Sequence, residues 1–327
     1  MSVLREMPKA LLLATMTMLV QAPATADTVP LGALSKMGGK MGGKMGDTGQ
    51  PVPAYILELP DSVTEVLVAE TDTATLFRFR RDGADMRRYD QRYMSIGENG
   101  VGKQRAWDRR TPLGIYFVTD RLDPNRLPDR YGAAAFPLDY PNTLDRLAGR
   151  SGDGIWIHGV DPHVGQRPPL ATDGCLALGN DDLLAMAPAI APLVTPVVIT
   201  PRLEHLTPAA IARLRDELKA ELERWVSSFE TGDLYTYLSL YAEDFVFHGL
   251  PRERWLALQL GRFGSRSAAA VTLEDLVLLK DPVEDEVYLS RFTRSTVENG
   301  RRMAITQRLY WHRSATGVWR IIAEDSG

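Results

Sequence analysis

Apolar residues in the middle of the chain fall in short runs that are separated by turn residues. Between Tyr55 and Arg202 these runs are rich in Val, Ile, Tyr, Phe and Trp, and Gly, Pro and Asp punctuate them. Such a pattern is typical of β-strands. It predicts strands at 65–70, 74–80, 92–97, 114–120, 154–159 and 195–200. A short helix is predicted to follow Gly179, with Asn180 as its N-cap. We therefore expect a mainly β domain over residues 55–203.

The pattern changes at Thr207-Pro208, a pair that suits the cap and first position of a helix. Apolar residues then recur at helical spacing as far as Phe229, and Gly232 is a suitable stop. A second short helix is predicted from Asp233, and strands are predicted at 286–298, 302–313 and 317–325. Two helices packed on a curved antiparallel sheet form an α+β domain. We place this second domain at residues 207–327.

The first 54 residues show neither pattern. Arg5 and Lys9 precede an apolar run at 10–20, and the small residues Ala24 and Ala26 follow it. This order is typical of a Sec signal peptide, which we place at 1–26. The run is shorter than the roughly 20 apolar residues that span a bilayer, although an uncleaved anchor is the alternative. Residues 27–54 repeat GGKM and predict a flexible linker. We expect a periplasmic protein that meets the membrane only during export.

Composition narrows the function classes. The 327 residues are 44% hydrophobic and carry a net charge of −4, which allows real cores and argues against a nucleic-acid-binding face. Cys175 is the only cysteine. In an exported chain it has no intramolecular partner, so it is a buried inert residue, an intermolecular crosslink or a reactive thiol.

The surroundings of Cys175 supply what a thiol nucleophile needs. His158 ends a predicted strand and is placed to act as a base that lowers the thiol pKa. Gly174 allows a tight turn whose N–H groups face a developing oxyanion. The loop between them is polar and rich in proline, so we expect the thiol at the rim of a cleft.

Two other interpretations fit an isolated Cys/His pair. In the first, Cys175 is a small core residue and His158 is an edge histidine. In the second, His158, His163 and Cys175 bind zinc, but the sequence offers no clear fourth ligand and no recognised ligand spacing. We predict no metal and no cofactor.

Several motifs in the right order favour catalysis. They are IHG at 157–159, TDGC at 172–175 and SIGENGVGKQRAWDRRTPLGIYFV at 95–118. With these motifs, residues 66–200 resemble the YkuD-type L,D-transpeptidase catalytic domain. The resemblance implies a β-sandwich in which Cys175 is the nucleophile, His158 the general base and Gly159 the backbone carbonyl that orients it. The N–H groups of Gly174 and Cys175 would form the oxyanion hole.

The same resemblance implies a substrate. Cys175 would attack the meso-diaminopimelate–D-alanine bond of a peptidoglycan stem tetrapeptide, and an amine or water would resolve the thioester. Ala177 stands where the family commonly has arginine, which argues against the standard 3,3-crosslinking substrate. The stretches GIWIHG and GCLALGND resemble a cell-shape subgroup that pairs this domain with an NTF2-like domain and includes L,D-carboxypeptidases. Release of a protein attached to peptidoglycan and non-catalytic wall binding are the alternatives. Candidate substrate-binding residues are Lys103, Tyr131, Thr172 and Asp173.

Residues 207–327 resemble the NTF2-like fold, through the helix pair and a final strand-turn-strand ending in GVWRIIAED. That resemblance implies a cone with a pocket. We expect a docking module for wall fragments or an envelope protein and no catalysis in this domain.

Overall fold

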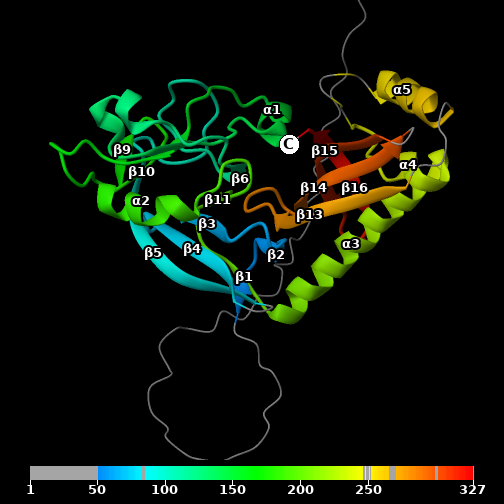
Figure 1. The fold of residues 1–327 in the computed structure, drawn as a ribbon, viewed down its shortest axis with the longest axis horizontal. Helices are drawn as coiled ribbons and strands as arrows, with labels where there is room; N and C mark the ends of the chain where they lie inside the picture. The colour runs from blue at the N-terminus through cyan, green and yellow to red at the C-terminus, as the bar shows by residue number, and fades with distance from the viewer. Residues whose placement is uncertain are drawn as a thin grey trace, which may run out of the picture. The chain divides into compact units, whose positions relative to one another are not determined.

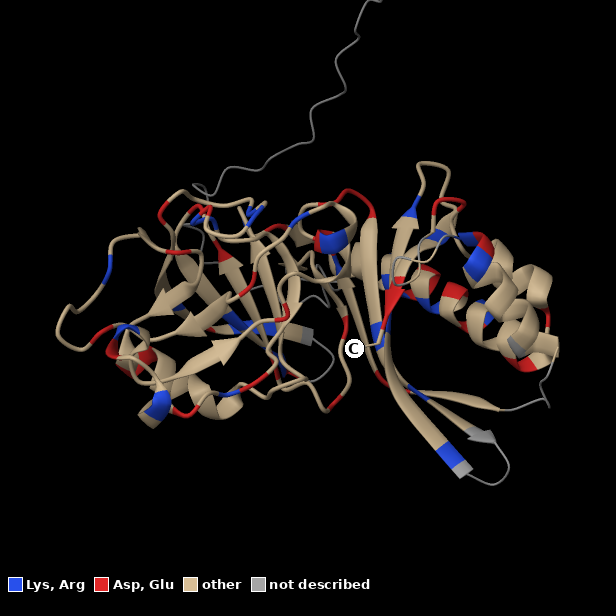
Figure 2. Cartoon of the chain, turned by 90° about the horizontal axis from the view of Figure 1, so that it is seen from above, with Lys and Arg blue, Asp and Glu red and all other residues tan. Residues whose placement is uncertain are grey.

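The structure is a computed structural model that describes residues 51–326, except 83–84, 246, 248–249, 251, 265–269 and 299–300. The predicted signal peptide and nearly all of the predicted linker lie outside the described residues. The described part belongs to one compact unit, Gly49–Gly327. Figure 1 shows its elements, and Figure 2 shows acidic and basic residues interspersed along them.

A nine-stranded sheet forms the first half of this unit. Its strand order is β6-β11-β3-β4-β5-β10-β8-β7, and β9 pairs with β5. The strands are β3 (Glu65–Glu70), β4 (Thr75–Asp82), β5 (Asp85–Gly97), β6 (Gly114–Phe117), β7 (Ala135–Pro137), β8 (Trp156–His158), β9 (Leu170–Thr172), β10 (Leu176–Leu178) and β11 (Pro196–Thr200). Short helices connect them: η1 (Pro124–Arg126), η2 (Asp129–Tyr131), α1 (Thr143–Leu147), α2 (Asn180–Met186) and η3 (Ala187–Ala189).

Helices and a second sheet form the other half. The sheet order is β16-β15-β14-β13-β2, and the helices include α3, which runs along this sheet in Figure 1. The elements are β2 (Ile56–Glu58), α3 (Pro208–Thr231), α4 (Leu234–Ser239), α5 (Arg252–Gly264), β13 (Val271–Lys280), β14 (Val287–Glu298), β15 (Arg301–Arg313) and β16 (Trp319–Asp325). A small separate pair joins β1 (Val52–Pro53) to β12 (His205–Leu206).

The predicted order of a mainly β domain and then an α+β domain is confirmed. The cap of α3 is also as predicted, since the Thr207 hydroxyl accepts a hydrogen bond from the Ala210 N–H. The prediction of two helices in the second domain is incomplete, because α5 is a third. It was missed because its apolar residues follow a proline and a charged stretch with no clear stripe. Strand β13 was missed as well.

The two halves share a hydrophobic core. All six residues of β3 are buried. Leu67 and Ala69 pack into the core of the first half, while Val66 and Val68 pack into a second core. That second core also holds Leu279 and other residues of the second half. A strand that is buried on both faces reads as a continuous apolar run, as the four central residues of β3 do in the sequence.

The two halves are not strictly consecutive along the chain. Strand β2 precedes β3, yet it pairs with β13 and completes the second sheet. A partly buried ion pair also joins the halves, because Arg308 Nη1 lies 2.5 Å from Asp139 Oδ2. The shared core and this pair hold the second half in place against the sheet that carries Cys175.

Candidate active site

Strand pairing brings Cys175 and His158 to the same place. Strands β8 and β10 are parallel neighbours, and their register sets Ala177 opposite His158. Neighbouring strands lie about 4.8 Å apart, and residues two apart share a face. The register therefore puts Cys175, just before β10, on the face of His158. Two residues 17 positions apart in the sequence thus lie on one face of adjacent strands.

The ring of His158 is held by the backbone. Its Nδ1 lies 2.6 Å from the carbonyl oxygen of Gly159. A carbonyl only accepts, so this contact assigns the ring proton to Nδ1 and leaves Nε2 with a lone pair. Tyr131 adds an edge-on ring contact with His158 at 5.2 Å between centroids. The arrangement gives a neutral imidazole with a free basic nitrogen, and its contact with Gly159 is the one that the family resemblance implies.

Asn180 secures the backbone beside His158. Its Oδ1 accepts from the N–H groups of Ala133 and Val160, at 3.0 and 3.1 Å, and its Nδ2 donates to the Val160 carbonyl. A Cβ on Gly159 would lie 2.2 Å from that Oδ1, so only glycine fits. The prediction that Asn180 caps α2 is wrong, because Gly179 is the N-cap. The side chain instead serves the His158 strand, a role that a helix-start pattern conceals.

The turn that carries Cys175 is closed by two threonines. The Thr172 hydroxyl donates to the Cys175 carbonyl at 2.8 Å and accepts from the Gly174 N–H at 3.1 Å. Thr111 donates to the Gly174 carbonyl at 2.9 Å. Gly174 has φ of +124°, and a Cβ there would lie 2.6 Å from the Arg110 carbonyl oxygen. Glycine is thus required at this position.

These contacts change the expected roles of two residues. Thr172 is buried and its hydroxyl is used within the turn, so the structure makes it a positioning residue with no polar group turned to a substrate. The Gly174 N–H also points to Thr172, so it reaches an oxyanion only if that bond breaks. Thr111, which the sequence did not single out, is the further support of the turn.

The thiol is more buried than the sequence predicts. Cys175 is 9% exposed, and its Sγ donates to the Gly154 carbonyl at 3.3 Å. Burial raises the pKa of Cys175 to about 11, although the Trp156 amide opposes this shift. Burial also lowers the pKa of His158 to about 4. The expectations of a thiol at a cleft rim and of a pKa lowered by His158 are therefore wrong for this resting state. Both groups are neutral at pH 7.

This neutral pair predicts the pH dependence of alkylation. The rate of iodoacetamide labelling of Cys175 should rise about tenfold per pH unit between pH 7 and 10, because the thiolate fraction does so below a pKa of about 11. Mass spectrometry of the labelled protein measures the rate, and free glutathione is the reference. A rate that levels off below pH 7 would contradict the neutral pair, since it would indicate a thiolate–imidazolium pair.

The remaining candidates differ in exposure. Lys103 is 3% exposed, and its Nζ lies 2.8 Å from Asp108 Oδ1, so it faces the protein and not a substrate. Its charge nevertheless acts to lower the pKa of Cys175. Tyr131 is half-buried and touches His158, and Asp173 is exposed beside Gly174. Tyr131 and Asp173 thus stay candidates for substrate contact.

No group of three or more His, Cys, Asp or Glu side chains in the described ranges is arranged to hold a metal ion. No helix in the part of the chain that the structure describes is long and apolar enough to cross a membrane.

Comparison with known families places two matches on the chain. Residues 64–199 match the YkuD family, an L,D-transpeptidase catalytic domain, and residues 217–325 match the Cds6 C-terminal NTF2-like domain. The first match covers β3 to β11 apart from the last residue of that strand, and so includes both Cys175 and His158. No curated protein matches the sequence.

Solved structures share the fold of most of the chain. Bd1075 from Bdellovibrio bacteriovorus is 23% identical, with a TM-score of 0.71 over 85% of this chain and 98% of its own. Pgp2 from Campylobacter jejuni, a helical cell shape determining protein, is 24% identical, with a TM-score of 0.70 over 86% of this chain and 96% of its own. At these identities the likeness shows the fold, with both halves in the same order.

Proposed function

Because the chain carries a YkuD-type L,D-transpeptidase catalytic domain followed by an NTF2-like domain, we propose that it is a cysteine acyl-transfer enzyme of peptidoglycan stem tetrapeptides. The observation that carries the proposal is the pairing of β8 with β10, which sets Cys175 on the same sheet face as a histidine with a free Nε2. The scissile bond joins meso-diaminopimelate to D-alanine. The periplasm, where this substrate lies, is the proposed location.

The first half-reaction begins with a neutral thiol. Cys175 turns from the Gly154 carbonyl towards His158, and Nε2 takes the thiol proton as sulfur attacks the peptide carbonyl carbon. The C–N bond then breaks, and the imidazolium returns the proton to the leaving amine of D-alanine. The Gly159 carbonyl, which accepts from Nδ1–H, stabilises the transient imidazolium.

We propose water as the acceptor in the second half-reaction. His158 takes a proton from water and hydroxide adds to the thioester carbonyl. The C–S bond then breaks, and the imidazolium returns the proton to the Cys175 sulfur as the tripeptide acid leaves. Ala177 supports this choice, because the chain has no cation two residues after the nucleophile. Ala177 is 2% exposed and lies in β10, where it pairs with Ser95 on one side and His158 on the other. The products are a tripeptide and D-alanine, as for an L,D-carboxypeptidase.

Purified full-length protein and disaccharide tetrapeptides test this proposal. We expect mass spectrometry to detect the disaccharide tripeptide and free D-alanine without crosslinked dimers. Dimers would show that an amine is the acceptor and would overturn the carboxypeptidase assignment. A peptidoglycan-linked protein that is released while tetrapeptides stay intact would instead support a hydrolase of protein attachment.

A further inference from the structure

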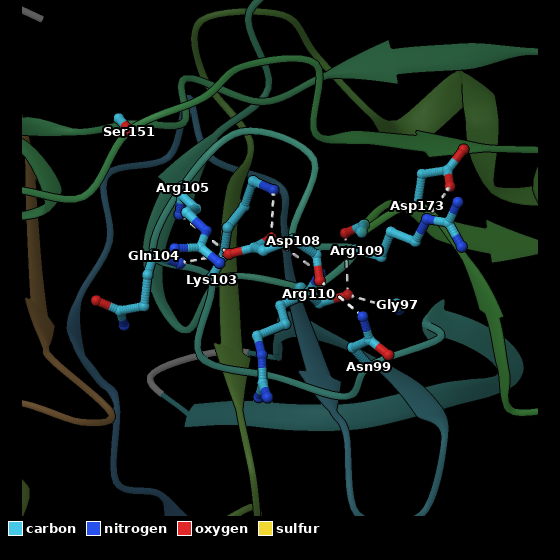
Figure 3. A network of polar contacts seen from close by, with 12 residues as sticks. Gly97, Asn99, Lys103, Gln104, Arg105, Asp108, Arg109, Arg110, Ser151 and Asp173 are labelled. Atoms are coloured by element: carbon cyan, nitrogen blue, oxygen red, sulfur yellow. Dashed lines mark hydrogen bonds and ion pairs between the residues drawn. The ribbon is translucent and has the colours of Figure 1, made fainter.

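The segment 103–110, here called the 103–110 loop, is fixed to the turn that carries Cys175. Thr111, the next residue, accepts from the Gly97 N–H at 2.9 Å and donates to the Gly174 carbonyl at 2.9 Å. Arg109 Nε lies 3.7 Å from Asp173 Oδ1, and Figure 3 shows this side chain extended towards Asp173. The C-terminal end of the loop is therefore joined to the turn that carries the nucleophile.

The loop is built around one carboxylate. Asp108 accepts from Lys103 Nζ at 2.8 Å and from the N–H groups of Gln104, Arg105 and Arg110 at 2.7, 3.0 and 3.1 Å (Figure 3). Charge-assisted bonds of this kind are stronger than neutral ones. They fix the backbone on both sides of Asp108 and so define the position of the residue before it.

That residue is Trp107, and it has two properties that do not favour folding. Its side chain is 92% exposed, so it adds almost nothing to a core. Its φ is +64°, a region where a bulky side chain is an outlier and costs about 1–2 kcal/mol. A single exposed apolar residue is ordinary on a protein surface. An exposed indole on a strained, carboxylate-anchored loop next to the active site needs another explanation, and strain of this kind clusters at functional sites.

We propose that Trp107 is a glycan platform, on which the indole ring stacks against the apolar face of a hexosamine of the glycan strand. The proposal rests on the proposed function, because the strand is the one whose stem peptide reaches Cys175. Indole offers a flat apolar face with a polar N–H, which suits a sugar ring with C–H groups and hydroxyls. The exposed side chains of Arg105, Arg109 and Arg110 flank it in the sequence, and Arg109 already pairs with Glu98 and Asp173.

Trp107→Gly in the full chain tests the platform, since it removes the ring and relieves the backbone strain. Leu193→Gly is the matched control, because Leu193 is 61% exposed, has φ of +62° and lies outside the site. Neither variant should lower the thermal unfolding temperature through the backbone. We expect W107G to lower kcat/KM for disaccharide tetrapeptide by about 3- to 10-fold, the worth of one aromatic contact. Turnover of the sugar-free tetrapeptide should not change, and L193G should match the wild type on both substrates.

A glycan-binding assay tests the platform independently of the proposed enzymatic function. Pull-down on amidase-stripped glycan strands, with no stem peptides, is measured for C175A, C175A/W107G and C175A/L193G. We expect at least about 3-fold weaker binding for C175A/W107G alone. This result would support the platform even if the wild type released no D-alanine.

Three outcomes would overturn the platform. One is unchanged glycan binding and unchanged turnover in W107G. Another is an equal loss on the sugar-free and the disaccharide substrate, which would mean that Trp107 acts through the catalytic turn. The third is unchanged glycan binding together with lost binding to an envelope protein, which would assign Trp107 to a protein partner.

Discussion

Replacing Cys175 with alanine should lower the turnover of disaccharide tetrapeptide by at least about 10³-fold, because no other residue in the site supplies a nucleophilic sulfur. The fold should survive, since alanine fills nearly the same buried space and the turn is held by Thr172 and Thr111 through backbone groups. Chromatographic measurement of released D-alanine gives kcat/KM, and circular dichroism checks the fold.

Folded C175A that keeps more than a tenth of the wild-type rate would contradict this prediction. A wild type that binds sacculi but shows no turnover would favour the alternative of a non-catalytic wall-binding protein. In that case Cys175 would be a small core residue and His158 an edge histidine, which is the first alternative interpretation from the sequence.

Replacing His158 with asparagine should lower kcat/KM by about 10²- to 10⁴-fold, the usual contribution of a general base. Asparagine can still donate to the Gly159 carbonyl, but it has no basic nitrogen to accept the thiol proton. His163→Asn is the matched control, because His163 is exposed on the loop after β8. The same D-alanine assay applies, and equal rates for H158N and H163N would exclude His158 as the base.

The pKa of His158 also predicts the pH range in which the protein loses stability. Its pKa is about 4 in the fold and about 6.5 ordinarily, so the unfolded chain binds the proton more readily between these values. Stability is therefore complete above pH 6.5 and falls by about 3 kcal/mol as the pH drops to about 4. Urea unfolding between pH 4 and 7 should show this fall in the wild type, and the fall should be smaller in H158N. Activity should also decline as the pH falls towards about 4, because the base becomes protonated.

The sequence predicted the strands that alternate with clear turn signals, and it predicted the Cys175/His158 pair from local motifs. It did not predict strands β7, β9 and β10, because three residues show no period by themselves. Strand β8 is equally short but was predicted from the longer run GIWIHG. Nor did it predict that β2 joins the second sheet, since a strand's partner depends on contacts more than 200 residues away along the chain.

The electrostatics of the site were the least accessible from sequence. A histidine near a cysteine suggests an ion pair, but whether one forms depends on burial, which the sequence does not specify. Here both side chains are buried, and this desolvation moves both pKa values towards the neutral forms. The positioning role of Asn180 was hidden for a related reason, because asparagine at the start of a helix normally indicates a cap.

Acid-quenched intact-mass spectrometry of the wild type, milliseconds after mixing with disaccharide tetrapeptide, tests the central claim most directly. We predict an adduct with the mass of the substrate minus D-alanine, mapped to the peptide that contains Cys175 and removed by hydroxylamine as a thioester is. Release of D-alanine without an adduct on Cys175, or with an adduct on another residue, would contradict the account.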